Sequence, residues 1–210
     1  MFKFSDLRQI HLEISNNCQA SCPMCSRNVH GGLDNPLIKI KDWTLEEFKT
    51  VMTSEVLQQL HGFYFCGTFG DPIMNNNIIQ MCEYSRDSNS QIQIHIHTNG
   101  GMRKPQWWKD LARALPDNHL VVFGIDGLED TNHLYRVGVN YQNVIANGIG
   151  ICLKTFPKTI LRYSRLLSRK PPAYRMLLST KYIGYKIEKQ LKKYTSVLTV
   201  LLIEKPKKVY

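Results

Sequence analysis

The stretch Asn16–Asn28, NNCQASCPMCSRN, holds three of the six cysteines of this 210-residue chain. Cys18, Cys22 and Cys25 are separated by three and then two residues, so their thiolates can converge on one soft metal centre. Pro23 breaks any regular packing period here, which argues against three buried structural cysteines. The stretch therefore predicts a metal or redox site.

Two kinds of metal centre fit three clustered thiolates. A structural zinc site requires a closed tetrahedron, which His30 would complete as a fourth ligand. A cubane iron–sulfur cluster held by three thiolates instead leaves one iron open to an external ligand. The spacing alone leaves both alternatives open.

Short apolar segments on either side of this stretch predict strands. In Gln9–Ser15 and Gln91–His97, every second residue is isoleucine or leucine, which is typical of a strand with two unlike faces. Gly62–Cys66 and His119–Ile125 are short apolar runs bounded by or containing glycine. We therefore expect four strands before residue 126.

Helical signals lie between these strands. Thr44 and Glu47 form a capping box, and apolar residues then follow at helical spacing as far as Val56. Further helices are expected after Asn75–Asn77, from Pro105 and from Asn140. The alternating order of strands and helices predicts an α/β fold with a parallel sheet.

The alternation within two strands indicates a partial barrel. Parallel strands covered on both faces are usually apolar throughout, whereas here His11, Glu13, His95 and His97 share the polar positions. A partial (β/α) TIM-like barrel explains this pattern if the isoleucines pack outward against helices and the polar side chains line the lumen. The alternative is an antiparallel sheet with one wet face, which the intervening helices disfavour. In a β/α barrel the cysteines lie at the carboxyl-end mouth, where such folds keep their chemistry.

At this point the sequence resembles the radical S-adenosylmethionine superfamily, whose signature is three cysteines with this spacing directly after a first strand. Three further strand ends resemble family motifs in the family order: Phe65–Pro72, His97–Gly101, and Phe123–Gly127 followed by His133 and Arg136. The last is closest in pattern to the branch of peptide modification and of molybdenum-cofactor and PQQ biosynthesis. The matches cover residues 8 to about 147.

The resemblance implies the cofactors. Cys18, Cys22 and Cys25 are expected to hold a [4Fe–4S] cluster, with S-adenosylmethionine chelating the open iron. Met24 stands where the family usually has an aromatic residue whose neighbourhood packs against adenine, and a thioether can do the same apolar work.

The resemblance also implies roles for the other strand ends. Gly70, Asp71 and Pro72 resemble the segment that accepts hydrogen bonds from the ammonium of S-adenosylmethionine, and Asp71 replaces the usual glutamate. Asn99 and Asp126 are candidates for contacts near the ribose hydroxyls or the substrate. The alternative for both is an Asx residue that caps a turn.

The function implied is reductive cleavage of S-adenosylmethionine to a 5′-deoxyadenosyl radical, which abstracts hydrogen from an unknown substrate; a peptide or protein is one such class. A low-potential electron donor, flavodoxin-like or ferredoxin-like, is implied as a partner. Two alternatives are kept: a non-catalytic nucleic-acid-binding protein with a cysteine-rich metal knot and basic tail, and an inactive truncated remnant of the family.

The net charge of +10 is confined to the end of the chain. Residues 1–146 hold 12 Lys and Arg against 15 Asp and Glu, whereas residues 147–210 hold 15 against 2. We expect a core at residues 1–147 and an atypical basic segment at 148–210, which either completes the barrel or is a replaced, out-of-frame terminus. A fifth strand is expected from Gly150–Leu153, basic helices over 160–195 and a sixth strand at Ser196–Ile203. Nucleic-acid binding through this segment is not favoured, because such a charge run is usually a solvated face.

Targeting signals are not recognisable in the sequence. No apolar run reaches the roughly 18 residues of a membrane span, and the N-terminus lacks the apolar region of a secretory signal. We expect a cytoplasmic protein, where reducing thiol pools favour metal or redox use of clustered cysteines over disulfides.

Overall fold

The computed structural model describes residues 3–29, 31–152 and 159–163. Within these residues, five strands form one sheet in the order β1-β2-β3-β4-β5. The strands are β1 (Gln9–Leu12), β2 (Gly62–Phe65), β3 (Gln93–Thr98), β4 (Leu120–Ile125) and β5 (Thr159–Tyr163). The helices are α1 (Leu45–Val51), α2 (Ser54–Gln59), α3 (Ile78–Ser88), α4 (Pro105–Ala114), α5 (Asn132–Tyr135) and α6 (Tyr141–Cys152), with 3-10 helices η1 (Phe4–Asp6) and η2 (Pro72–Met74).

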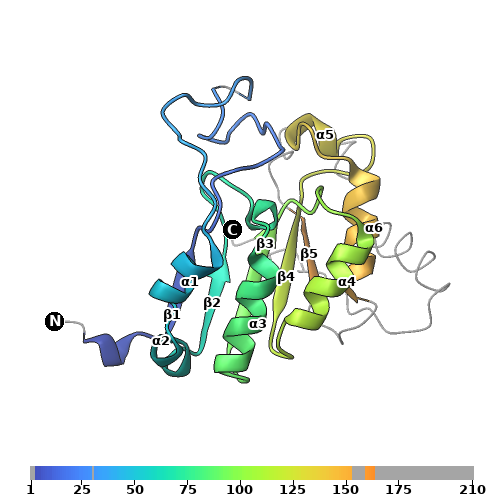
Figure 1. Ribbon diagram of the computed structural model, residues 1–210. Coiled ribbons are helices and arrows are strands. Elements are labelled where there is room, and N and C mark those ends of the chain that lie inside the picture. The colour runs from blue at the N-terminus through green and yellow to red at the C-terminus, as the bar shows by residue number, and fades with distance from the viewer. Residues whose placement is uncertain (1–2, 30, 153–158, 164–210) are drawn as a thin grey trace, which may run out of the picture.

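All four strand pairings are parallel. The order of the strands across the sheet is the same as their order along the chain, and each connection between neighbouring strands contains at least one helix. Figure 1 shows α1, α3 and α4 along one side of the sheet, while the long loop after β1 rises beyond its upper edge. The predicted α/β class is confirmed, and the antiparallel alternative is wrong.

The sheet has one apolar and one polar face, as the alternation predicts. Side chains of β1 to β4 that face the helices are almost fully buried: Leu12, Phe63, Phe65, Ile94, Ile96, Val121 and Phe123. The intervening positions are exposed or partly buried at His11, Tyr64, His95 and His97. His11 stacks on Tyr64 with ring centroids 4.7 Å apart, and Tyr64 lies 6.2 Å from His97. A polar face on a parallel sheet fits the lumen of a partial barrel.

The first predicted helix is broken in two. Thr44 accepts from the backbone N–H of Glu47 at 3.1 Å, and the Glu47 carboxylate accepts from the Thr44 N–H at 2.9 Å, so the predicted capping box is present. The expected continuation to Val56 is wrong, because Thr53 caps a new helix by accepting from the Val56 N–H at 3.3 Å. Pro105 begins α4 as expected.

The compositional change at residues 146–148 falls inside α6. The fifth strand expected from Gly150–Leu153 is wrong, since residues 150–152 end α6, and the fifth strand is β5. The basic helices expected over 160–195 are wrong at 160–163, which belong to β5; the rest of that range and Ser196–Ile203 lie outside the described residues. The parallel sheet thus continues past residue 147.

Candidate functional site

The loop from Glu13 to Asp42, which we call the cysteine loop, is tied to the segment after β2. The carboxylate of Glu13 accepts from the backbone N–H of Phe69 at 2.7 Å, and Asp71 donates its backbone N–H to the carbonyl of Asn17 at 2.8 Å. A Cβ on Gly70 would lie 2.0 Å from the carbonyl oxygen of Ser15. The backbone of the segment after β2 therefore packs directly against the backbone at the start of the cysteine loop. Only glycine at position 70 allows this close approach.

The cysteine loop holds three reduced thiols. Cys22 is buried, whereas Cys18 and Cys25 are half-buried. Burial raises the pKa of Cys18 to about 11, with the charge of Asp71 adding to the effect. Burial also raises the pKa of Cys22, against the opposing effect of the Arg136 guanidinium. Neutral thiols are therefore favoured until a metal replaces the proton.

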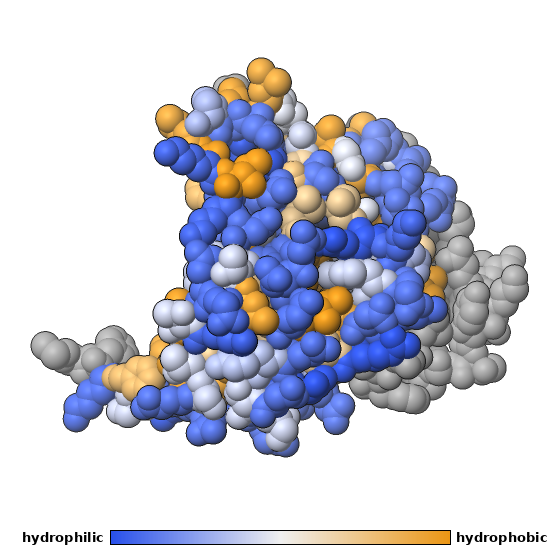
Figure 2. Space-filling view, in the orientation of Figure 1, coloured by the Kyte–Doolittle hydropathy of each residue, from blue (hydrophilic) through white to orange (hydrophobic). Residues whose placement is uncertain are grey.

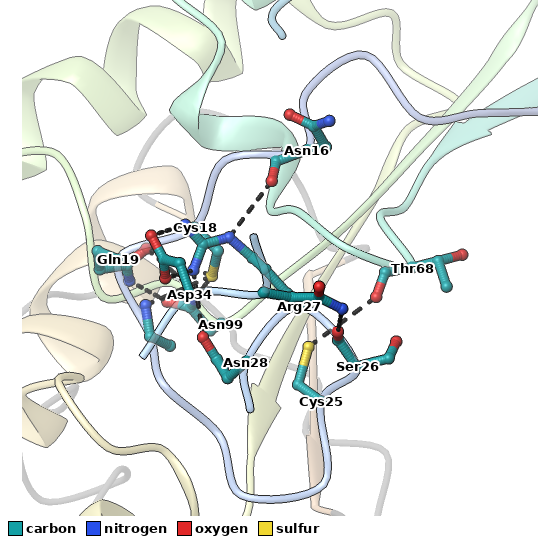
Figure 3. Close-up of polar contacts among 12 residues, drawn as sticks. Asn16, Cys18, Gln19, Cys25, Ser26, Arg27, Asn28, Asp34, Thr68 and Asn99 are labelled. Carbon is teal, nitrogen blue, oxygen red and sulfur yellow. Dashed lines mark hydrogen bonds and ion pairs between the residues drawn. The ribbon is translucent and has the colours of Figure 1, made fainter. Parts of the chain in front are cut away.

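Asn99, after β3, faces Cys18. Its Nδ2 lies 3.5 Å from the sulfur of Cys18, and its Oδ1 accepts from Gln19 Nε2 at 2.6 Å (Figure 3). Oδ1 also accepts from the Gly101 N–H at 2.9 Å. The bond to Gly101 is the Asx turn that the sequence left as an alternative. Because two donors occupy Oδ1, the amide nitrogen is the end that points at sulfur.

Asp126, after β4, holds Arg136 beside Cys22. The Asp126 carboxylate accepts from Arg136 Nε at 2.5 Å, and Arg136 Nη1 lies 3.8 Å from the Cys22 sulfur. Burial lowers the pKa of Arg136, but the charges of Asp126 and Cys22 outweigh it and leave the pKa raised, so the guanidinium stays cationic. A Cβ on Gly124 would lie 2.6 Å from Arg136 Nη2. The absence of a side chain at Gly124 therefore leaves the space that the Arg136 guanidinium occupies.

Asp71 is an internal connector between strand ends. It is 4% exposed, and its Oδ2 accepts from the Asn99 N–H at 2.7 Å and the Thr98 hydroxyl at 3.0 Å. Its Oδ1 accepts from the Ile73 N–H at 3.2 Å, which caps η2. Burial raises the pKa of Asp71, and these donors oppose the shift. The neighbouring Pro72 is buried in the first turn of η2, and Gly70 is half-buried.

Arg27 is a site residue for which the sequence gave no motif. It is 5% exposed and binds Asp34 through two nitrogens, at 2.9 and 3.3 Å. Its Nε donates to the carbonyl of Asn16 at 3.3 Å (Figure 3). Arg27 therefore joins the start of the cysteine loop to its far arm, close to the third cysteine.

The outer part of the cysteine loop exposes large apolar side chains: Met24, Val29, Leu33, Leu37 and Ile40. Figure 2 shows orange, hydrophobic groups gathered on the protrusion that this loop forms at the top of the view. Met24 is 77% exposed, so its contact with adenine stays a prediction. Beyond the cysteine loop, Cys82 in α3 is buried in the core, whereas Cys66, directly after β2, is half-buried.

A polar depression of about 570 Å³ lies at the other end of the sheet and is unrelated to the cysteines. Its lining includes Arg8, Gln59 and Asn89. The side-chain nitrogens of these residues already donate to backbone carbonyls of residues 4–7, 57 and 60.

The thiol set fits an iron–sulfur cluster. In the described ranges, no three His, Cys, Asp or Glu side chains are arranged to hold one metal ion, and His30 lies outside them. In a [4Fe–4S] cluster each cysteine binds a different iron, so the sulfurs stand farther apart than the ligands of a single ion. Thiolates are the ligands such clusters require, and hydrogen bonds to sulfur set their potentials. Two of the three sulfurs have a nitrogen donor beside them.

The family model described as the Radical SAM superfamily matches residues 12–163. The chain therefore belongs to this superfamily of S-adenosylmethionine-dependent enzymes, whose members carry a [4Fe–4S] cluster. The match includes all three cysteines, the ends of β1 to β4 and the whole of β5. Among curated proteins, no sequence matches this chain.

Solved structures of low identity share the fold. Native anSMEcpe with bound AdoMet superposes with a TM-score of 0.58 at 19% identity, covering 97% of this chain and 55% of its own. BtrN in complex with AdoMet and 2-DOIA gives 0.53 at 15% identity, covering 78% and 57%. Methylornithine synthase (PylB) gives 0.52 at 12% identity, covering 74% and 44%. The chain thus spans little more than half the length of the first of these structures.

Within residues 3–29, 31–152 and 159–163, no helix combines the length and the apolar character that crossing a membrane requires.

Proposed function

We propose that the chain is a radical S-adenosylmethionine enzyme whose cluster is held by Cys18, Cys22 and Cys25. The observation that carries the proposal is the meeting of four motifs at one edge of the parallel sheet, where Gly70, Asn99 and Arg136 contact the cysteine loop. When bound, the reduced cluster supplies the electron that cleaves S-adenosylmethionine to methionine and the 5′-deoxyadenosyl radical, which takes a hydrogen atom from the substrate.

The residues of this chain have separate tasks in the proposal. The backbone of Gly70 to Pro72 accepts the ammonium of S-adenosylmethionine, because carbonyls in a glycine-containing turn are accessible. Arg136 places a half-buried positive charge beside Cys22, which offsets the negative charge of the thiolates and of the methionine carboxylate. Met24 covers the adenine when the cofactor is bound.

Asn99 and Asp126 receive roles different from the ribose contacts expected from the sequence. Their side chains point to Cys18 and to Arg136 respectively, and Asp126 is 1% exposed. We therefore assign Asp126 to holding Arg136 in place. The other oxygen of Asp126, Oδ1, is buried and has no hydrogen-bond partner among the described residues. It can therefore accept a hydrogen bond from a bound ligand or water.

We propose that the substrate binds at the polar face of the sheet. His11, Tyr64 and His97 come from three adjacent strands, and their rings follow one another across the face below the cysteine loop. Aromatic and imidazole groups suit a polar organic substrate such as a peptide. Superfamily members typically take electrons from flavodoxin or ferredoxin, and we propose such a donor, and a cytoplasmic location, for this chain.

The division of the chain is part of the proposal. Residues 1–147 provide the cluster and cofactor contacts, and residues 148–210 extend the barrel, beginning with the end of α6 and β5. A terminus read in another frame is the competing explanation for the basic composition, and the coding DNA after codon 146 distinguishes the two.

Anaerobic reconstitution tests the proposal. We expect about four irons per chain, and 5′-deoxyadenosine after reduction in the presence of S-adenosylmethionine. Cys22→Ala is expected to lose both, while Cys82→Ala, a buried cysteine in α3, keeps the cluster. Zinc alone at the cysteines, or an equally active Cys22→Ala protein, would contradict the proposal. Salt-sensitive binding of RNA without cluster uptake would support the nucleic-acid-binding alternative.

A further inference from the structure

Hydrogen bonds to the backbone and to the side-chain oxygen of Asn99 orient its amide nitrogen toward Cys18. The backbone N–H of Asn99 donates to Asp71, and its Oδ1 accepts from Gln19 and Gly101. Asn99 as a whole is only 4% exposed. A buried amide held this way cannot turn without losing two hydrogen bonds. Its Nδ2 is therefore a fixed donor that lies 3.5 Å from the Cys18 sulfur and also 3.5 Å from Gln19 Oε1.

The three sulfurs have different neighbours. Cys18 accepts from the Ala20 backbone N–H at 3.4 Å as well as from Asn99, and it donates to Gln19 Oε1 at 3.8 Å. Cys22 has Arg136 at 3.8 Å. For Cys25 the corresponding contact is the carbonyl oxygen of Thr68 at 4.0 Å, which is an acceptor. Cys18 is thus the sulfur with two N–H donors at the shorter distances.

Hydrogen bonds to cysteine sulfur withdraw electron density from an iron–sulfur cluster, so they stabilise its reduced state and raise its reduction potential. We propose that Asn99 is a positioning residue that raises the potential of the cluster through its N–H···S bond to Cys18. The family motif after β3 suggests a contact between Asn99 and S-adenosylmethionine, whereas in this structure the Asn99 amide faces Cys18. This inference rests on the proposed function, since it requires Cys18 to be a ligand.

Two variants separate the donor from the rest of Asn99. Asn99→Asp keeps the shape and the acceptor oxygen for Gln19 and Gly101, but replaces the NH2 group with an oxygen. Asn99→Ala removes the donor without adding charge. Gln19→Ala, the comparison variant, removes the contacts of Gln19 with Asn99 and Cys18 but keeps the Asn99 amide and its hydrogen bond from Gly101.

The experiment is an anaerobic redox titration of the reconstituted full-length proteins, followed by electron paramagnetic resonance of the reduced cluster. We expect midpoint potentials more negative than wild type in both Asn99 variants, with the larger shift in Asn99→Asp, and a smaller shift in Gln19→Ala. We also expect deuterium exchange to change a proton coupling of the wild-type cluster that both Asn99 variants lack.

Several outcomes would overturn the inference. Unchanged potentials with full iron content would do so, and so would a loss of S-adenosylmethionine affinity of about tenfold at unchanged potential, which one lost ribose contact would cause. Loss of the cluster from both Asn99 variants would show a role in assembly instead. If wild type itself forms no [4Fe–4S] cluster, the proposed function fails, and that result is distinct from a cluster whose potential ignores Asn99.

Discussion

The carboxylate of Asp71 accepts the backbone N–H of Asn99 at 2.7 Å, which is one of two buried hydrogen bonds that join Asp71 to the end of β3. Asp71 binds the cysteine loop through its own backbone N–H, and Asn99 reaches Cys18 through its amide. The environment of the first cysteine is therefore built from three separate parts of the chain, which explains why the motifs stand at successive strand ends.

Removing the Asp71 side chain is expected to lower the free energy of unfolding. Asp71→Ala leaves the Asn99 N–H, the Thr98 hydroxyl and the Ile73 N–H without their acceptor, and unsatisfied buried donors cost about 1–3 kcal/mol. Urea unfolding of the apoprotein measures the change. Asp117→Ala, at an exposed position, is the control and should stay within about 0.5 kcal/mol of wild type. Equal stabilities of the two variants would contradict the connector role.

Arg27 is expected to stabilise the cysteine loop locally. In Arg27→Ala the link between Asn16 and Asp34 is lost, so proteolysis between residues 29 and 41 should become faster and iron uptake should fall. The control is Lys41→Ala, which breaks an exposed ion pair with Glu47 in the same region. Such pairs contribute about 0–1 kcal/mol, so its digestion rate should match wild type. Identical digestion of both variants would count against the prediction.

Gly70 should not tolerate a methyl group. The Cβ of Gly70→Ala would lie 2.0 Å from the Ser15 carbonyl oxygen and 2.6 Å from the Asn16 Cα, and both are backbone atoms that cannot turn aside. We expect a loss of at least about 1–3 kcal/mol in unfolding free energy, together with lost S-adenosylmethionine binding. Gly32→Ala, whose Cβ would meet only the Val29 carbonyl at 3.2 Å, should cost less. The reverse order of stabilities would refute this prediction.

Gly124→Ala should act through Arg136. The new Cβ would meet the far end of that side chain, which can move, so the fold should keep its stability within about 1 kcal/mol. The guanidinium would be displaced from Asp126 and Cys22. We therefore expect S-adenosylmethionine affinity to fall about tenfold, as in Arg136→Ala, since a charge-assisted contact contributes on this scale. Equilibrium dialysis with reconstituted protein measures it, and an unchanged affinity in Gly124→Ala would show that the position of Arg136 is unimportant.

The sequence predicted the parallel β/α core because alternation, capping and strand-end motifs are local signals. It did not predict Arg27, since neither Arg27 nor Asp34 belongs to a motif and their pairing depends on the path of the loop. The break between α1 and α2 had a local signal in Thr53, outweighed by the apolar spacing. The direction of the Asn99 amide follows from contacts with Gln19 and Gly101, which no pattern shows.

If Cys18, Cys22 and Cys25 hold a four-iron cluster, one iron of that cluster stays open to S-adenosylmethionine. Mössbauer spectroscopy of the reconstituted cluster, before and after S-adenosylmethionine is added, tests it most directly. We expect the parameters of one iron to change, because that iron gains nitrogen and oxygen ligands, while those of the other three irons stay as they were. A spectrum that S-adenosylmethionine leaves unchanged would contradict it.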